Sequence, residues 1–334
     1  MRKGLIFVVV MIAFISCSKE VTQQVEFGEA LGTTYQIIYF DTAKNEQFSA
    51  QIDSVFAAVN QSMSTYIPTS DISKLNAGDS SIRVDAMFQE VFLQSKDIYE
   101  ATGGAFDPTV GSLVNAWGFG PETAIEMDSM AVDSIMRYVG FNKVSLQANQ
   151  TIKKEHPSIY FDFNAIAKGY SLDRIALVLD RLGYSNYLIE VGGELVAKGQ
   201  HVVKKKPFLV GVDDPQSDDR SSPVALLQLQ DAAMASSGNY RKFKIDATTG
   251  VKYVHTINAK TGFTKVSNIL AVSVIAPNCA MADGYATAFM AMDLPDTQKL
   301  LRTQQTVQAY VIYLDEDGKT QQFFTPGFKA LVLD

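Results

Sequence analysis

The sequence predicts an α+β fold, and three observations lead to this class. Residues 25–40 alternate between apolar and polar side chains and are rich in β-branched residues, which is typical of a pair of strands. Apolar residues then recur at helical spacing over residues 52–59. Further along, strand and helix patterns follow one another without strict βα alternation, which favours α+β over a doubly wound sheet. The 334 residues, 47% of them hydrophobic and 19% charged, exclude a mostly disordered chain.

Helices are expected where apolar residues form one stripe and a stop signal follows. They lie around residues 52–59, 88–98, 168–182 and 280–292. Gly103 and Gly104 end the second helix, Gly183 ends the third, and Asn278 is placed to cap the start of the fourth. Residues 64–76 are rich in Ser, Thr, Asp and Pro and are expected to form a loop.

The remaining strands are expected where short apolar or alternating runs are bounded by turn residues. After the first pair, they occupy residues 158–163, 186–191, 208–212, 269–275, 307–314 and 321–324. The last two strands are expected to form a hairpin across residues 315–318, which read Asp-Glu-Asp-Gly.

The N-terminal segment carries an export signal. Arg2 and Lys3 precede an apolar stretch over residues 5–15, which is too short for a membrane span. Ser16 and Cys17 end this stretch in the pattern of a bacterial lipoprotein processing site. We therefore expect lipidation at Cys17, with simple secretion as the alternative.

This signal divides the chain into three parts. We expect residues 1–16 to be a lipoprotein signal peptide, residues 17–25 a tether, and residues 26–334 the functional domain. The lipid anchor would hold that domain on the periplasmic face of a bacterial membrane.

Charge and cysteine content exclude two kinds of site. The net charge is −7 and there is no long basic run, which argues against broad electrostatic binding to nucleic acid. The two cysteines, Cys17 and Cys279, are too few for a Cys-based zinc site. Cys279 is expected to be a small buried apolar residue.

Two segments could bind a nucleotide and a metal. Asp283 and Thr287 are spaced to lie on one face of a helix, and carboxylate and hydroxyl oxygens suit Mg²⁺. A surface pair has the same spacing, so this signal alone is weak. Residues 162–170 run from a strand into a helix, with small residues that allow close backbone approach, and Lys168 at the helix start suits a phosphate. An ordinary strand–helix junction is the alternative.

A serine and a histidine raise the possibility of a hydrolase. Ser236 and Ser237 lie beside a glycine, and His255 follows downstream. No Gly-x-Ser-x-Gly elbow surrounds either serine, which argues against this chemistry. His255 lies in an alternating segment, where a half-buried structural histidine is the alternative.

Eight segments, in chain order, resemble the ApbE family, the FAD:protein FMN transferases. They are residues 31–35 (LGTTY), 63–66 (MSTY) with 70–76 (SDISKLN), 102–108 (TGGAFDP), 162–170 (DFNAIAKGY), 190–194 (EVGGE), 235–240 (ASSGNY), 255–262 (HTINAKTG), and 282–283 with Thr287. Each motif is weak alone, but their shared order over most of the chain is specific. The family fold is a single α+β unit whose two lobes enclose FAD, and a lipoprotein signal also fits the family.

The resemblance implies the site residues. The positions that match FAD contacts are Leu31, Tyr66, Ala105, Phe106, Asp107, Asp162 and Lys168. Tyr66 would stack on the adenine and Lys168 would neutralise the pyrophosphate. The positions that match Mg²⁺ ligands are Asp283, Thr287 and the backbone carbonyl of Ala165, and His255 matches a histidine proposed to act in the transfer. Leu31 stands where Met is common, and Asn258 and Ala259 replace an acid and a proline of the family pattern.

The reaction implied by the resemblance is Mg²⁺-dependent transfer of FMN from FAD to a Thr or Ser hydroxyl of an acceptor protein, with release of AMP. The acceptor would be a redox protein bearing Asp-Gly-x-Thr/Ser-Gly-Ala-Thr/Ser. Residues 317–320 begin in this way, but two glutamines follow, so a hairpin turn is favoured there. The alternatives are an Mg²⁺-dependent FAD pyrophosphatase, which uses water in place of the hydroxyl, and a non-catalytic flavin-binding lipoprotein.

Overall fold

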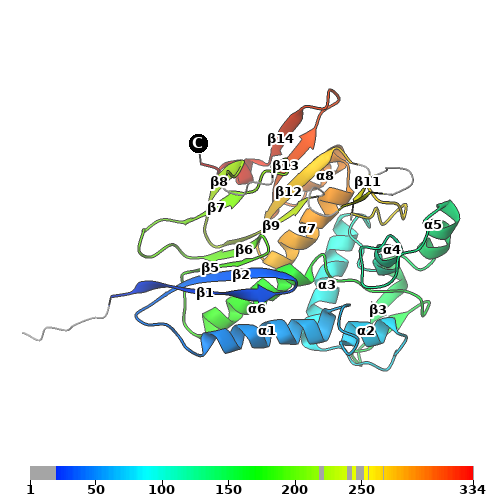
Figure 1. Ribbon diagram of the computed structural model, residues 1–334, viewed down its shortest axis with the longest axis horizontal. Coiled ribbons are helices and arrows are strands. Elements are labelled where there is room, and N and C mark those ends of the chain that lie inside the picture. Colours follow the sequence, from blue (N-terminus) through cyan, green and yellow to red (C-terminus); the bar gives the residue numbers. More distant parts are fainter. Residues whose placement is uncertain are drawn as a thin grey trace, which may run out of the picture.

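The computed structural model has a mixed α+β architecture built on one large antiparallel sheet (Figure 1). It describes residues 20–217, 222–238, 243–245, 252–254, 256–265 and 267–333. Within these residues the sheet has eight strands, in the order β1-β2-β5-β6-β9-β12-β13-β14. Their bounds are β1 (Thr22–Ala30), β2 (Thr33–Asp41), β5 (Tyr187–Val191), β6 (Glu194–Lys198), β9 (Ala232–Gly238), β12 (Ile269–Ala276), β13 (Gln308–Leu314) and β14 (Thr320–Phe324).

Three two-stranded sheets and a set of helices complete the described fold. The small sheets pair β3 (Val144–Leu146) with β4 (Ile152–Lys154), β7 (Phe208–Val212) with β8 (Ala225–Leu229), and β10 (Phe243–Ile245) with β11 (Lys252–Val254). The helices are α1 (Phe48–Met63), α2 (Asp71–Asn76), α3 (Ala86–Ala101), α4 (Gly111–Ala116), α5 (Ser129–Met136), α6 (Ala167–Arg181), α7 (Cys279–Ala291), α8 (Leu294–Leu301) and α9 (Pro326–Lys329), with a 3-10 turn at Phe141–Lys143. None of these helices is long and apolar enough to span a membrane.

The two faces of the large sheet are covered by different layers. Side chains alternate across a strand, so successive residues of each strand face opposite sides. Ile37 and Ile189 point to the face that packs on α1 and α6. Val210 of the β7–β8 hairpin and Phe328 of α9 cover the other face, where they meet Tyr310 of β13. The sheet therefore lies between a helical layer and a hairpin layer.

Helices α6 and α7 approach each other closely because Gly169 has no side chain. A Cβ at Gly169 would lie 2.6 Å from the carbonyl carbon of Cys279 and 2.9 Å from Cβ of Asp283. The backbone N–H of Gly169 donates a hydrogen bond of 3.0 Å to Oδ2 of Asp283. A larger residue here would separate the two helices.

The first turn of α7 is held by side chains from both helices. The carboxylate of Asp173, on α6, accepts hydrogen bonds from the N–H groups of Cys279 (2.8 Å) and Ala280 (2.9 Å). Asn278 caps the same turn by accepting from the N–H of Met281, as expected from the sequence. Burial raises the pKa of Asp173 to about 6. A helix leaves its first four N–H groups without a partner inside the helix, and these side chains bond three of them in α7.

Most of the expected elements are confirmed, and the mixed class with them. The first strand pair, the helix stops at Gly104 and Gly183 and the closing hairpin lie where the sequence predicts them. Cys279 is buried and has no disulfide, as expected. β1 begins at Thr22, so residues 22–25, which we assigned to the tether, are paired with β2.

Two expectations about local structure are wrong. Residues 64–76 are not all loop, because Ser70 caps the short helix α2 and Ile72 and Leu75 are buried beneath it. Residues 158–163 do not form a strand and contribute one isolated bridge through Tyr160. The side chain of Asn76 bonds both the N–H and the carbonyl of Phe161, at 2.8 Å each, and so satisfies groups that a strand partner would otherwise bond.

We expect Gly169→Ala to lower the free energy of unfolding by about 3 kcal/mol, since the methyl group meets backbone atoms that cannot rotate away. Urea unfolding followed by circular dichroism measures this change. Gly284→Ala, on α7, is the matched control, because its methyl would lie 2.5 Å from Cδ1 of Ile98, a side-chain end that can move. Equal losses in the two variants would show that the α6–α7 approach has no special importance.

Candidate active site

One large cavity gathers the residues that the sequence singled out. Its volume is about 1180 Å³, and it is lined by the β1–β2 turn, the loops before α4 and α6, the β5–β6 turn, and α7. The predicted site residues on its wall are Leu31, Tyr66, Ala105, Phe106, Asp107, Asp162, Ala165, Lys168, Asp283 and Thr287. The remaining predicted residues, His255 and Cys17, lie outside the described residues.

A buried ion pair lies at the start of α6. Nζ of Lys168 is 2.7 Å from Oε2 of Glu194, and the Glu194 side chain is 2% exposed. Burial by itself would lower the pKa of Lys168, but the charges of Glu194 and Asp283 outweigh this effect and raise that pKa above its usual value. Lys168 is therefore a permanent positive charge on the cavity wall.

Two buried acidic side chains, Glu194 and Asp283, lie close to this ammonium group. Burial, and then the neighbouring Asp283, raise the pKa of Glu194 to about 8, against the opposing effect of Lys168. Burial likewise raises the pKa of Asp283, which Lys168 only partly offsets. Burial thus resists ionisation of both carboxyl groups, and one ammonium group offsets this only in part. An added cation would favour their ionised forms.

Asp283 and Thr287 present oxygen atoms to the cavity from one face of α7. Asp283 is 4% exposed, and the hydrogen bond from Gly169 engages its Oδ2. Thr287 is half-buried one turn further along, and Ala165 lies across from them in the loop that enters α6. The described residues contain no group of three or more His, Cys, Asp or Glu side chains that could hold a metal. A metal here would therefore need hydroxyl and backbone oxygens beside the carboxylate.

Asp162 and Tyr66 also line the cavity. The carboxylate of Asp162 accepts a 2.7 Å hydrogen bond from the N–H of Asn164. The backbone N–H of Asp162 donates a hydrogen bond to the carbonyl of Pro108. Burial raises the pKa of Asp162. Tyr66 is 59% exposed, which leaves its ring available for stacking. Burial of its hydroxyl, and then the charge of Asp162, raise the pKa of Tyr66.

Asp107 lines the cavity, but its carboxylate holds the surrounding loops. Oδ1 accepts hydrogen bonds from both the N–H (2.8 Å) and the hydroxyl (2.7 Å) of Thr109, and Oδ2 accepts from the N–H of Phe141 (3.1 Å). Burial raises the pKa of Asp107, and these hydrogen bonds oppose the shift. The position of Asp107 at the cavity thus follows from its structural contacts.

The structure adds residues to which the sequence analysis assigned no role. Glu194 belongs to the quoted EVGGE motif, and only the fold shows that it pairs with Lys168. Thr256 and Ile257, which follow His255 in the chain, line the cavity wall. Ser236, which we considered as a nucleophile, shares a 2.7 Å hydrogen bond with Ser273 of the neighbouring strand.

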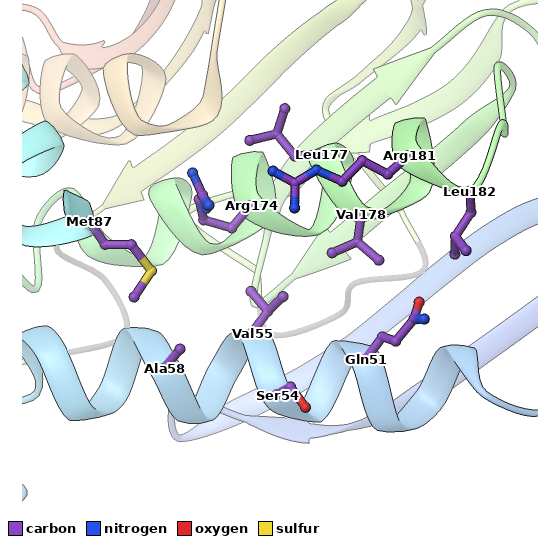
Figure 2. A pocket seen from close by; sticks show the side chains of 10 residues that line it. All are labelled: Gln51, Ser54, Val55, Ala58, Met87, Arg174, Leu177, Val178, Arg181 and Leu182. Carbon is purple, nitrogen blue, oxygen red and sulfur yellow. The ribbon is translucent and has the colours of Figure 1, made fainter. Parts of the chain in front are cut away.

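A second cavity lies elsewhere and has different chemistry. It measures about 400 Å³ and lies between α1 and α6 (Figure 2). Figure 2 shows mostly aliphatic side chains with the guanidinium groups of Arg174 and Arg181 along α6. None of the predicted site residues lines it. The larger cavity is therefore the candidate active site.

Substitution of Asp107 should affect the free energy of unfolding much more than substitution of Tyr66. We expect Asp107→Asn to lower the free energy of unfolding by about 2 kcal/mol, because an amide cannot accept all three hydrogen bonds. Tyr66→Ala should change it by less than about 0.5 kcal/mol, because the ring is largely exposed. Thermal and urea unfolding without ligand measure both. A Tyr66 variant that is the less stable of the two would contradict this division of roles.

Comparison with known proteins places this fold and site in one family. The ApbE family model matches residues 31–311. The FAD:protein FMN transferase of Haemophilus influenzae is 32% identical, over 94% of this chain and 93% of its own length. That of Vibrio cholerae is 31% identical over 99% of both chains. The solved structure of the flavin transferase ApbE from Vibrio cholerae superposes with a TM-score of 0.84 and 30% identity, covering 93% of this chain and 100% of that chain. The chain therefore belongs to the ApbE family.

Proposed function

We propose that this protein is an FAD:protein FMN transferase. The bond between the FMN phosphorus and the bridging pyrophosphate oxygen breaks, and AMP leaves with that oxygen. The phosphorus forms a new bond to the hydroxyl oxygen of a Thr or Ser on an acceptor protein, whose proton passes to a base. The observation that carries this proposal is the convergence of Lys168, Asp283 and Thr287 in a cavity that Tyr66 also lines, in a chain with full-length relatives of this activity.

Several cavity residues have properties that suit binding of FAD. The exposed ring of Tyr66 offers a flat surface for the adenine. The ammonium group of Lys168 lies at the N-terminal end of α6, where its charge and the positive end of the helix dipole together favour the pyrophosphate. Phe106 and Leu31 supply apolar wall on either side. Lys168 would also oppose the charge that develops on the transferred phosphate.

The donor set fits Mg²⁺, and we assign its ligands to Asp283, Thr287 and the backbone carbonyl of Ala165. The fit rests on the buried Asp283 carboxyl group, whose ionised form a nearby cation would favour. When bound, Mg²⁺ neutralises charge on the reacting phosphate. The N–H of Gly169 bonds one carboxylate oxygen of Asp283, so the other oxygen would be the one to bind the ion.

We infer that His255 handles the proton of the acceptor hydroxyl. The inference is supported by its match to the family motif and by the neighbouring Thr256 and Ile257, which line the cavity. The lipoprotein signal supports a lipid anchor at Cys17 and a periplasmic location. An acceptor that is an exported or membrane-bound redox protein fits that location.

The direct test is intact-protein mass spectrometry of an acceptor fragment that bears the Asp-Gly-x-Thr/Ser-Gly-Ala-Thr/Ser segment. After incubation with the protein, FAD and Mg²⁺, we expect the fragment to gain one FMN phosphoryl unit, and EDTA to prevent this. Asp283→Asn should slow the transfer about 100-fold or more, because a group that stabilises developing charge is lost. An unmodified acceptor with free FMN and AMP would support the pyrophosphatase instead.

Mg²⁺ binding has a second test that does not need activity. At a concentration of 100 times its dissociation constant, Mg²⁺ should stabilise the wild-type protein by about 2.7 kcal/mol. Asp283→Asn should abolish this gain while keeping the fold, because the amide oxygen can still accept the Gly169 hydrogen bond. Since burial raises the pKa of Asp283, its charge costs stability at neutral pH, and the metal-free variant should be no less stable than wild type.

Asp296→Asn is the matched control for this thermal measurement. Asp296 is exposed in the first turn of α8 and does not line the cavity. The Asp296→Asn variant should keep the full gain in stability from Mg²⁺. An Asp283 variant that still gains stability from Mg²⁺ would exclude Asp283 as a ligand.

A further inference from the structure

Strand β7 lies on the wall of the candidate active-site cavity, and one of its edges has no strand partner among the residues that the structure describes. Within the described residues β7 pairs only with β8, so its second edge has no strand partner. The last three residues of this strand, numbered 210–212, and the following Asp213 line the same cavity as Lys168 and Asp283. Side chains alternate along a strand, so an unbroken run of lining residues means that the backbone itself faces the cavity.

The hydrogen bonds of β8 fix which groups of β7 point to that edge. Gln228 donates its N–H to the carbonyl of Leu331 (2.9 Å), and the carbonyl of Leu226 accepts from the N–H of Leu333 (2.8 Å). The backbone groups of Leu226 and Gln228 therefore face the C-terminal segment, away from β7. In an antiparallel pair, two opposite residues turn their backbone groups either both toward or both away from each other.

The register then assigns the open groups to two residues of β7. Leu209 lies opposite Gln228 and Gly211 lies opposite Leu226. Their N–H and carbonyl groups must therefore point away from β8, and no backbone hydrogen bond is made by either residue within the described part of the chain. Gly211 has no side chain to cover these groups. The Leu209 side chain is 58% exposed beside them.

We propose that the acceptor's hydroxyl-bearing segment binds in extended form as an added strand along β7, through the backbone groups of Leu209 and Gly211. This inference rests on the proposed transferase function and names the place where its second substrate enters. An added strand gains main-chain hydrogen bonds that do not depend on the side chains of the partner. It would run along the hairpin toward Asp213 and so lead the hydroxyl into the cavity.

The position of β7 favours a polypeptide over the nucleotide as its occupant. The groups suited to phosphate, adenine and metal lie in the helical layer and its loops, at Tyr66, Lys168 and Asp283. β7 belongs to the hairpin layer on the other face of the sheet, where Val210 and Val212 pack. A row of alternating backbone donors and acceptors matches an extended peptide.

Leu209→Pro tests the backbone contact. It removes the N–H that points away from β8, two residues before Gly211 of the cavity wall. Proline is tolerated at an edge position whose N–H makes no ladder bond. We expect the KM for the acceptor fragment to rise about fivefold, the value of one backbone hydrogen bond, with the KM for FAD unchanged. Leu209→Ala retains the N–H and should raise the acceptor KM less than Leu209→Pro does.

Leu226→Pro is the matched control, because it places proline on the same hairpin at an exposed leucine whose N–H faces the opposite edge. It should leave both KM values unchanged. A second measurement needs no variant: amide hydrogen exchange of the wild-type peptide that contains β7 should slow when the acceptor fragment is added.

The outcomes separate this inference from the function on which it rests. If wild type transfers FMN but Leu209→Pro leaves the acceptor KM unchanged, or β7 gains no protection from exchange, the acceptor does not dock on β7. If wild type transfers no FMN to any acceptor fragment, the proposed function fails first, and binding of the fragment to β7 loses its basis.

Discussion

The close approach of α6 to α7 at Gly169 is the constraint on which the site depends. Lys168 and the loop carrying Ala165 belong to the α6 side, whereas Asp283 and Thr287 belong to α7. Only a residue without a side chain lets the backbone of Cys279 lie against α6, and the hydrogen bond from Gly169 to Asp283 then sets the direction of the carboxylate. The N–H groups of α7 bound by Asp173 fix the same helix end. One contact thus aligns the two sides of the cavity to which we assign the phosphate and the metal.

That alignment concentrates charge where burial makes charge costly. The raised pKa values of Glu194, Asp283 and Asp173 all have burial as their largest cause. Such an arrangement weakens the empty protein, because ionised carboxylates out of water are unfavourable. A cation bound beside Asp283, as we propose, would offset this effect, since that carboxylate would then face compensating charge. A site shaped for a metal–nucleotide complex is expected to lower the stability of the empty protein and to raise it when the complex binds.

The sequence predicted elements well where the pattern is local and failed where a distant side chain intervenes. The periodicity of α1, α3, α6 and α7 is contained within each helix, so these elements could be read directly. Residues 158–163 have a strand-like composition, but Asn76, far away in the chain, bonds the backbone of Phe161 and leaves no ladder. The candidate site residues were predicted from the order of motifs, and the fold brings those that the structure describes to one cavity. The pairing of Glu194 with Lys168 and the structural use of Asp107 were not predicted, because both depend on contacts between distant segments.

The same limit explains why the sequence does not predict that one edge of β7 lacks a strand partner among the described residues. Residues 208–212 predict a strand, yet nothing in them says that the C-terminal segment occupies the far side of β8 and so orients every backbone group of the hairpin. The sheet separates a helical layer with charged groups from a hairpin layer with an open strand, and the cavity is lined from both. A reaction that joins a nucleotide to a polypeptide needs a surface for each of them, and the two surfaces must meet at the reacting phosphate. The arrangement of layers supplies this meeting point, because the turns at the ends of β1 and β5 bring both surfaces to one rim of the sheet.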